Sequence, residues 1–346
     1  MKTLQLFFRA KYGSKKGNTS LRIIDSKAEL WKPALLLLPS ILIILLFTIV
    51  PFVLTVIESF RVADEFAETI DDYSYGLGNY ALLFDEDNGI GTEFKVALRN
   101  SILYSVFSLP ISLTISILVS SAIFHIVNKH TRGLVQTVFF LPYVTNAIAV
   151  GSTFFFLFGG TGESKGLVNL VFGSEIRWLK SGDKESIYPL TVIIARGVWG
   201  NLAFQILILT SAMLGVNKQL YKSASIDGAY KAKQFFLITL PSIKKTISFL
   251  ITVGLIGGIK VFPLAVFNNN ADVAVNNGGS SIMLLIYRYV QRADYAKAAA
   301  LSACLVILGV SVSYTLRKLV YLLFLYAGKR GVKRVQKQIA NKANLS

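Results

Sequence analysis

Six long apolar blocks alternate with polar segments along the chain. They cover roughly residues 33–58, 101–124, 134–158, 187–214, 243–266 and 297–316. A helix needs about 20 mainly apolar residues to cross the hydrocarbon core of a bilayer, and each block reaches that length. The pattern therefore predicts an all-α polytopic membrane protein with six transmembrane helices, surrounded by lipid.

The composition supports this class and narrows the chemistry. Hydrophobic residues make up 53% of the 346 residues and charged residues only 16%, which is too apolar for an ordinary soluble protein. The single cysteine, Cys304, falls in the last block, so the chain can form no internal disulfide and no cysteine-based metal site. His125 and His130 have no carboxylate or cysteine near them in sequence, and we predict no metal site.

The net charge of +17 is segregated along the chain. Eight Lys or Arg residues lie in the first 32 residues, six lie between 216 and 245, and eight follow from Arg317 on. Acidic residues gather instead in the loop after the first block, for example at Asp71, Asp72 and Asp85. The positive-inside rule then places both termini and the 216–245 segment in the cytoplasm, and this topology accounts for the charge without nucleic acid. We predict a basic cytoplasmic arm at 1–32, a six-span domain at 33–316 and a basic cytoplasmic tail at 317–346.

The segment between the fourth and fifth blocks has turn and helix signals. Residues 221–241 read YKSASIDGAYKAKQFFLITLP. Asp227 and Gly228 are turn residues, and apolar residues recur at helical spacing on both sides of them. The pattern predicts two short helices bent near Asp227 and Gly228. Leu240 and Pro241 are predicted to close the segment, because a helix normally ends before the residue that precedes proline.

This segment resembles the EAA motif of binding-protein-dependent ABC importer permeases, in the version of the carbohydrate uptake branch that includes maltose and glycerol 3-phosphate permeases. The matching positions are Ala224, Asp227, Gly228, Ala229, Phe235, Ile238, Leu240 and Pro241. Lys222 and Ser223 stand where the family usually has Glu and Ala.

Other short motifs resemble the same family in the same order. They are Glu58-Ser59-Phe60, Gly76-Leu77-Gly78-Asn79-Tyr80, Ala97-Leu98-Arg99-Asn100-Ser101 and the segment around Gly278-Gly279. The resemblance covers about residues 33–316, and the two basic ends lie outside it.

The resemblance implies a type I ABC importer permease in the plasma (inner) membrane of a prokaryote. It implies that residues 217–240, with Lys222 and the eight matching residues, dock a cytoplasmic ABC ATPase dimer. It also implies a second permease subunit, forming a heterodimer, and an extracytoplasmic solute-binding protein. The ATPase uses the ATP, so this chain would be no enzyme and would bind no cofactor. We expect Asp227 to accept hydrogen bonds from the first amides of the second helix, and Ala224, Ala229 and Phe235 to supply buried contact.

The substrate implied by the resemblance is a sugar or oligosaccharide, with glycerol phosphates as a second class. Arg196 and Lys260 are the cations inside the spans, and they either snorkel to the interface or line the path of an anionic or hydroxyl-rich solute. Trp199 and Phe262 are nearby aromatic residues that could line the same path.

Two other classes of function are weaker alternatives. A secondary carrier or channel without an ATPase would need membrane-embedded acids or an inverted repeat, and the only acid in the six blocks is Glu58 at the edge of the first. A membrane-bound enzyme would need a cluster of catalytic residues. The Gly-rich turn at 159–165 lacks the Gly-Lys-Ser/Thr ending of a P-loop.

Finally, the apolar spacing after residue 281 predicts a helix along the membrane surface.

Overall fold

The computed structural model describes residues 31–63, 73–159, 165–315 and 318, which are mostly helical. Most of the predicted basic segments at 1–32 and 317–346, and most of the turn at 159–165, lie outside them. Within the described ranges, four helices are long and apolar enough to cross a membrane: Leu35–Glu58, Gly89–Phe124, Tyr188–Leu214 and Tyr295–Thr315. Two bent pairs, Lys129–Val144 with Ala147–Phe158 and Lys231–Ser242 with Lys244–Ile259, raise the number to six if each pair is one span.

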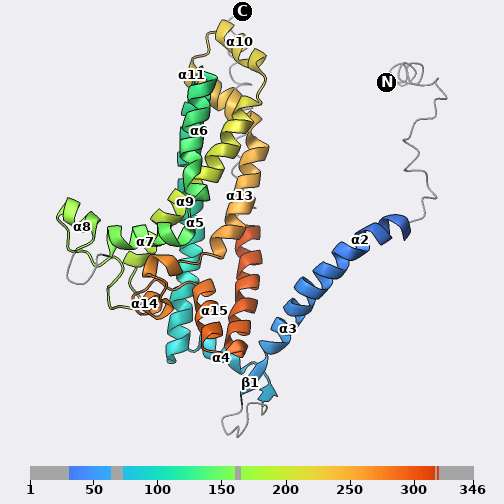
Figure 1. Cartoon of the computed structure of the whole chain (residues 1–346), viewed down its shortest axis with the longest axis vertical. Helices are drawn as coiled ribbons and strands as arrows, with labels where there is room; N and C mark the ends of the chain where they lie inside the picture. The colour runs from blue at the N-terminus through green and yellow to red at the C-terminus, as the bar shows by residue number, and fades with distance from the viewer. Residues whose placement is uncertain (1–30, 64–72, 160–164, 316–317, 319–346) are drawn as a thin grey trace, which may run out of the picture. The chain divides into compact units, whose positions relative to one another are not determined.

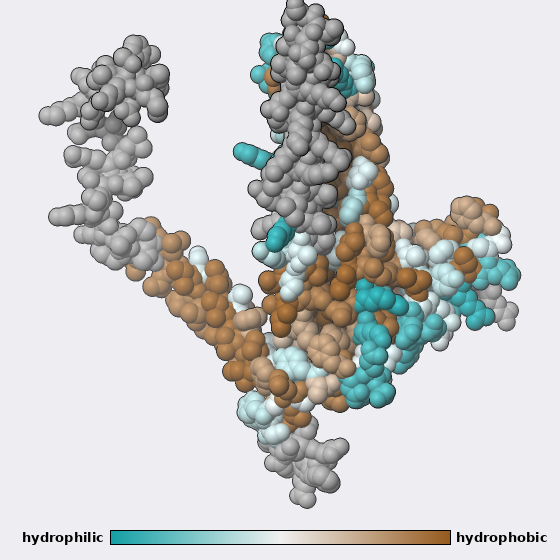
Figure 2. Space-filling view, turned by 180° about the vertical axis from the view of Figure 1, so that it is seen from behind, coloured by the Kyte–Doolittle hydropathy of each residue, from teal (hydrophilic) through white to brown (hydrophobic). Residues whose placement is uncertain are grey.

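The chain divides into two units, Met1–Leu54 and Thr55–Ser346. In the first unit, α2 (Trp31–Ile44), the π turn η2 (Leu45–Ile49) and the start of α3 (Val50–Glu58) form a continuous apolar helix. Its side chains from Leu35 on are exposed, and its surface is almost wholly apolar (Figure 2). In the wide turn η2, the Val50 amide bonds to the Leu45 carbonyl, one residue before Pro51.

In the second unit, α5 (Gly89–Phe124), α6 (Lys129–Val144), α9 (Tyr188–Leu214) and α13 (Lys244–Ile259) form a bundle (Figure 1). α5 begins at Gly89, well before the predicted start at 101. At about 1.5 Å per residue its 36 residues span about 54 Å, more than the ~30 Å hydrocarbon core. One end of α5 therefore projects beyond the hydrocarbon core.

A stripe of buried serines runs along α5 and contacts α9 through Ser112, Ser116 and Ser120. The serines recur every three or four residues, so they share one face of α5; they are Ser101, Ser105, Ser108, Ser112, Ser116 and Ser120. Gln205 of α9 donates to the Ser112 hydroxyl (3.1 Å) and accepts from Ser116 (2.9 Å). Small polar residues of this kind allow close helix contact and hydrogen bonds within a membrane.

The third predicted span, 134–158, is not one straight helix. α6 ends at Val144 and α7 (Ala147–Phe158) leaves it at an angle of 89°. Asn146 begins the new helix, because its side chain accepts a hydrogen bond from the Ile148 amide (2.8 Å). Gly151 then lets α7 lie against Ala265 of the 3₁₀ turn η4 (Leu264–Phe267), where an added Cβ would be 2.3 Å from the Ala265 Cβ.

The fifth predicted span, 243–266, also ends early. α13 stops at Ile259, because Pro263, four residues on, has no amide to bond the Ile259 carbonyl, and the chain continues as η4. α14 (Ala271–Asn276) and α15 (Ile282–Gln291) follow. The prediction that the helix after 281 lies along the membrane surface is wrong: Ile282, Leu285 and Tyr289 are buried in the main hydrophobic cluster.

A short hairpin and helix follow the first span, which the apolar pattern did not predict. Strand β1 (Arg61–Ala63) pairs antiparallel with β2 (Tyr73–Tyr75), and α4 (Gly78–Phe84) comes next. Asn79 donates to the carbonyls of Ser59 (3.1 Å) and Arg61 (2.8 Å), and the Tyr80 hydroxyl donates to Ser59 Oγ (2.8 Å). Two of the motifs singled out in the sequence thus hold each other in place.

Candidate functional site

Residues 217–240 form two helices joined by a tight turn. α10 (Lys218–Ile226) begins after Asn217, whose side chain accepts from the Gln219 amide (2.9 Å). Gly228 has a left-handed backbone, with φ of +71°. The Ala229 amide bonds to the Ala224 carbonyl and the Gly228 amide to the Ser225 carbonyl, which is the Schellman pattern. This turn explains why glycine follows Asp227.

The second helix begins with α11 (Lys231–Gln234) and continues through the π turn η3 (Phe235–Thr239) into α12 (Leu240–Ser242). The expected end before Leu240 and Pro241 is therefore wrong. In the wide turn the Leu240 amide bonds to the Phe235 carbonyl, five residues back. Proline clashes with the carbonyl of a normal α turn, and a π turn just before it relieves that clash.

Side chains fix the two helices to each other. Gln234 Nε2 donates to Ser225 Oγ (2.9 Å) and to the Ala229 carbonyl (2.8 Å), across the turn. The Tyr221 hydroxyl bonds to Thr239 Oγ1 (2.9 Å). The sequence analysis missed these partners, although glutamine is the residue type that can bridge a hydroxyl and a carbonyl.

The Asp227 carboxylate does not have its predicted role. Tyr230 is the residue before α11, and it makes no side-chain cap. Among the described residues the Asp227 side chain accepts no hydrogen bond from that helix. Asp227 instead ends α10, with its amide bonded to the Ser223 carbonyl.

The predicted contact residues differ in exposure. Ala224, Ala229 and Ile238 are half-buried, while Lys222, Asp227, Gly228 and Pro241 are exposed. Phe235 and Leu240 pack inward against the buried cluster that includes Met213 and Ile247, so Phe235 is only partly available to a partner. The apolar side chains presented outward beside the turn are Ile226, 87% exposed, and Tyr230, 70% exposed. In the sequence, these two residues can be recognised as the apolar residues directly before and after Asp227-Gly228-Ala229.

A polar recess of about 210 Å³ lies within the bundle, between α5, α9 and α13. Tyr104, Asn201 and Gln205 supply its polar groups, and a run of glycines on α13 forms its opposite wall. Gly254 allows α13 to pack closely against α5, because a Cβ there would lie 2.4 Å from Leu109 Cδ1. The recess offers a hydroxyl and two amides to a hydroxyl-rich solute.

The four predicted path residues have different surroundings. Arg196 is half-buried on α9, and Trp199, one turn further, packs edge-on against Phe154 at 6.2 Å. Phe262 packs edge-on against Tyr287 at 5.3 Å.

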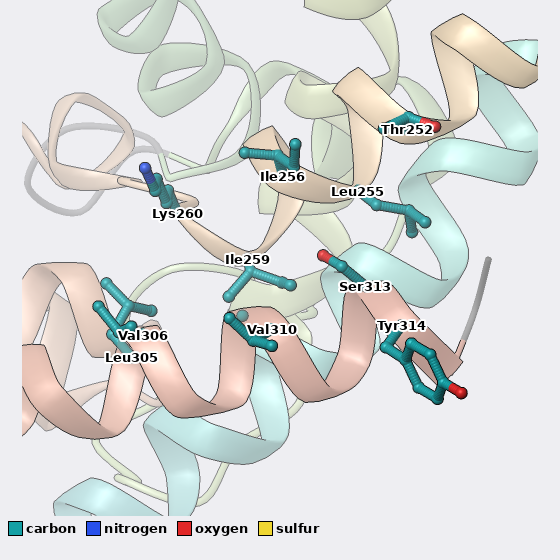
Figure 3. A pocket seen from close by; sticks show the side chains of 11 residues that line it. Thr252, Leu255, Ile256, Ile259, Lys260, Leu305, Val306, Val310, Ser313 and Tyr314 are labelled. Carbon is teal, nitrogen blue, oxygen red and sulfur yellow. The ribbon is translucent and has the colours of Figure 1, made fainter. Parts of the chain in front are cut away.

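Lys260 is exposed at the end of α13. It lies at one end of a mainly apolar groove of about 510 Å³ between α13 and the last helix, Tyr295–Thr315, with Thr252, Ser313 and Tyr314 toward the other end (Figure 3). A lysine at the end of an apolar surface can keep its stem in that surface and its ammonium in a polar region.

The other two sequence motifs meet at the opposite end of α5. Asn100 donates to the carbonyls of Gly278 and Ser280, both at 2.8 Å, and Ser101 Oγ accepts from the Ile282 amide (3.2 Å). Gly279 is required by space, because a Cβ there would lie 2.0 Å from the Phe267 ring. These residues fix the loop between α14 and α15.

An ion-pair cluster beside this loop contains Glu93, which precedes the second apolar block in the sequence. The structure places it in the first turns of α5, buried, with Arg288 Nη1 at 2.6 Å and Lys184 Nζ at 3.1 Å. Arg288 Nε also pairs with Asp272 at 2.7 Å. Burial raises the pKa of Tyr289, and the Glu93 charge adds to the rise. The described residues contain no group of three or more His, Cys, Asp or Glu side chains that could hold a metal ion.

Comparisons with known proteins agree with these motifs. No family model matches the chain. The chain is 42% identical over 329 residues to a probable ABC transporter permease protein of Mycoplasma genitalium, which covers 95% of this chain and 97% of that one. It is 27% identical over 285 residues to the arabinooligosaccharide transport system permease protein AraP of Halalkalibacterium halodurans, covering 82% and 85% of the two chains.

A solved structure shows the same fold. It is a bacterial ABC transporter involved in the import of the acidic polysaccharide alginate, with a TM-score of 0.61, 24% identity and coverage of 83% of this chain and 96% of that chain. The apolar helices and the relative matched at 42% identity over nearly its whole length lead to one assignment: this multi-pass membrane protein belongs to the family of ABC transporter permeases.

Proposed function

We propose that the chain is the permease subunit of a binding-protein-dependent importer, and that residues 217–240 carry the contact with its cytoplasmic ATPase. One observation supports this most: the Schellman-capped turn at Gly228, which presents the exposed Ile226 and Tyr230. A permease without a nucleotide site must receive the effect of ATP hydrolysis through a contact. A rigid turn with two outward apolar side chains suits such a contact.

The structure offers a route from this turn to a span. Gln234 couples the turn to α11, and α11 continues through η3 and α12 to α13. The Tyr221 ring also lies 5.8 Å from that of Phe124 at the end of α5. A displacement of the turn would therefore move α13 against α5. The two helices are in close contact at Gly254, so there is little free space between them to absorb the movement.

For the substrate, we infer a sugar or oligosaccharide. Relatives are named as permeases for arabinooligosaccharides, sn-glycerol 3-phosphate and lactose. The recess with Tyr104, Asn201 and Gln205 suits hydroxyl groups, and Phe204 in its lining gives an aromatic surface. Arg196, Trp199, Lys260 and Phe262 remain predicted path residues.

The rest of the assembly follows from the same proposal. It has six spans in a type I arrangement in a prokaryotic plasma membrane, both termini in the cytoplasm, and a second permease as partner. An extracytoplasmic binding protein delivers the solute. A related solved structure is described as an alginate transporter in complex with a periplasmic protein bound to an alginate pentasaccharide. A carrier or channel that works without an ATPase is favoured by none of these observations.

The ATPase contact can be tested by co-purification. We expect Ile226→Ala with Tyr230→Ala to reduce both co-purification of the ATPase and solute uptake, while the chain still inserts in the membrane. Phe236→Ala is the matched control, because Phe236 is similarly exposed, at 63%, but is not beside the turn. Full ATPase retention in the double variant would refute the contact. Asn201→Leu tests the recess separately, and should lower uptake without loss of the ATPase.

A further inference from the structure

A basic groove of about 580 Å³ lies between the end of α5, the start of α6 and the helices α10 and α11. Four cationic side chains line it: Arg132 on α6, Lys218 and Lys222 on α10, and Lys231 on α11. No acidic side chain lines it. Within the described part of the chain, none of the four forms an ion pair.

An anion bound here would relieve repulsion between the cations. Lys218 and Lys222 are four residues apart and so are neighbours on α10, where like charges repel. Asp227 is the one acid between residues 216 and 245, and it does not line the groove. The groove therefore has a strong local excess of positive charge with exposed donors for an anionic ligand.

The groove also has an apolar part, at the level where spans end. α5 ends at Phe124 and α9 ends at Leu214, and both residues line the groove. Val127, in the link between α5 and α6, lines it as well and is 96% exposed. Cations beside apolar side chains at the end of a span match the boundary between phosphates and acyl chains of a bilayer.

We propose that this groove binds the phosphate headgroup of an anionic phospholipid of the cytoplasmic leaflet. The proposal rests on the orientation in the proposed function, which puts this end of the bundle in the cytoplasm. Guanidinium and ammonium groups donate charge-assisted hydrogen bonds to phosphate oxygens, and basic pockets between membrane helices at the cytoplasmic side bind such headgroups.

An acidic segment of the ATPase is the other anion to consider. Of the residues assigned to the ATPase contact, Lys222 and Phe235 line the groove, but the outward apolar residues Ile226 and Tyr230 do not. The observations favour the lipid, because the groove contains Phe124 and Val127 beside its cations. A lipid held here would join the ends of α5 and α6 to α10 and α11. The positions of the docking helices α10 and α11 would then depend on the lipid composition of the membrane.

The test compares two triple variants of the full-length chain. One replaces Arg132, Lys218 and Lys231 with Gln and keeps Lys222, which belongs to the proposed ATPase contact. The matched control is Lys129→Gln, Lys233→Gln and Lys245→Gln. These lysines are exposed and do not line the groove. Like the three replaced groove cations, one lies at the start of α6 and two lie between residues 216 and 245. Both variants lose three charges, so a general attraction to the membrane surface falls equally.

Binding is counted by native mass spectrometry during titration of the detergent-solubilised chain with phosphatidylglycerol, with phosphatidylcholine of the same acyl chains, and with inorganic phosphate. We expect the groove variant to lose phosphatidylglycerol affinity by about fivefold per cation, or roughly a hundredfold in all, and the control to keep it. Phosphatidylcholine binding should be equal in all chains, and inorganic phosphate should not compete at equal concentration.

Several results would overturn the proposal. Equal losses in both variants would indicate general surface charge, and unchanged binding in the groove variant would remove the site. Competition by inorganic phosphate would indicate a free-anion site. Loss of ATPase co-purification in lipid-free detergent, with phosphatidylglycerol binding kept, would assign the groove to an acidic protein partner. The lipid titration needs no ATPase, so its result can be interpreted even if the docking proposal fails.

Discussion

Replacement of Gly228 gives the sharpest test of the docking turn. Gly228 has φ of +71°, and nothing lies within 4 Å of the position that a Cβ would occupy. A substitution there therefore causes no clash, and its whole cost is the left-handed backbone. That cost is about 1–2 kcal/mol for a side chain with a Cβ and is largest for β-branched residues, whereas asparagine tolerates the conformation.

We expect Gly228→Val to weaken the turn by about 2 kcal/mol, which corresponds to roughly a thirtyfold loss of affinity for the ATPase if the docked state requires the turn. Gly228→Asn should lose less than about fivefold. The assay is co-purification with increasing ATPase, together with uptake in cells in which membrane insertion has been verified.

Gly215→Val is the control for adding a β-branched side chain near this end of the bundle. Gly215 ends α9 with φ of −77°, and its nearest atoms to an added Cβ are 3.5 Å away, so valine causes no left-handed strain. Equal affinity for Gly228→Val and Gly228→Asn would refute the argument from backbone conformation. Normal coupling in Gly228→Val would remove the turn from the docking contact altogether.

Three further outcomes test the site and the packing around it. Lys222→Glu should reduce ATPase co-purification in lipid-free detergent, because the cognate ATPase is expected to have a neutral or acidic residue opposite Lys222; unchanged coupling would mean that the position is solvated. Gln205→Leu should lower thermal stability by about 1–2 kcal/mol, and Ser112→Ala should add little in that background, whereas additive losses would contradict the shared hydrogen bond. Gly279→Ala should destabilise by about 1–3 kcal/mol through overlap with the Phe267 ring, and Phe267→Leu should recover part of the loss in detergent melting curves.

The apolar blocks predicted most of the helices, because the bilayer sets a minimum length for an apolar run. They could not predict the 89° bend between α6 and α7, since both halves are apolar and only Asn146 marks the new helix start. Nor could they place α15, whose apolar face suits a membrane surface and a protein interior equally well. Only the fold shows that this face packs in the core.

The docking segment was predictable in outline from Asp227 and Gly228, whose turn chemistry is local. Its outward face was not, because exposure depends on what the bundle covers: Phe235 packs inward while Ile226 stays exposed. The serine stripe of α5 was readable as a spacing of three and four residues, and it was missed because serines are not apolar and do not contribute to a hydropathy pattern.

The π turn η3 has a consequence for tolerance to insertion and deletion. A π turn accommodates one residue more than a regular helical turn, and each residue advances an α-helix by about 100°. Loss of one residue from Phe235–Thr239 would turn the π turn into a regular α turn and leave the direction of the preceding helix nearly unchanged. Gain of one residue would instead rotate everything before it by about 100° around the helix axis, and with it the direction in which Ile226 and Tyr230 point. Homologous segments should consequently be one residue shorter across 235–239 more often than one residue longer.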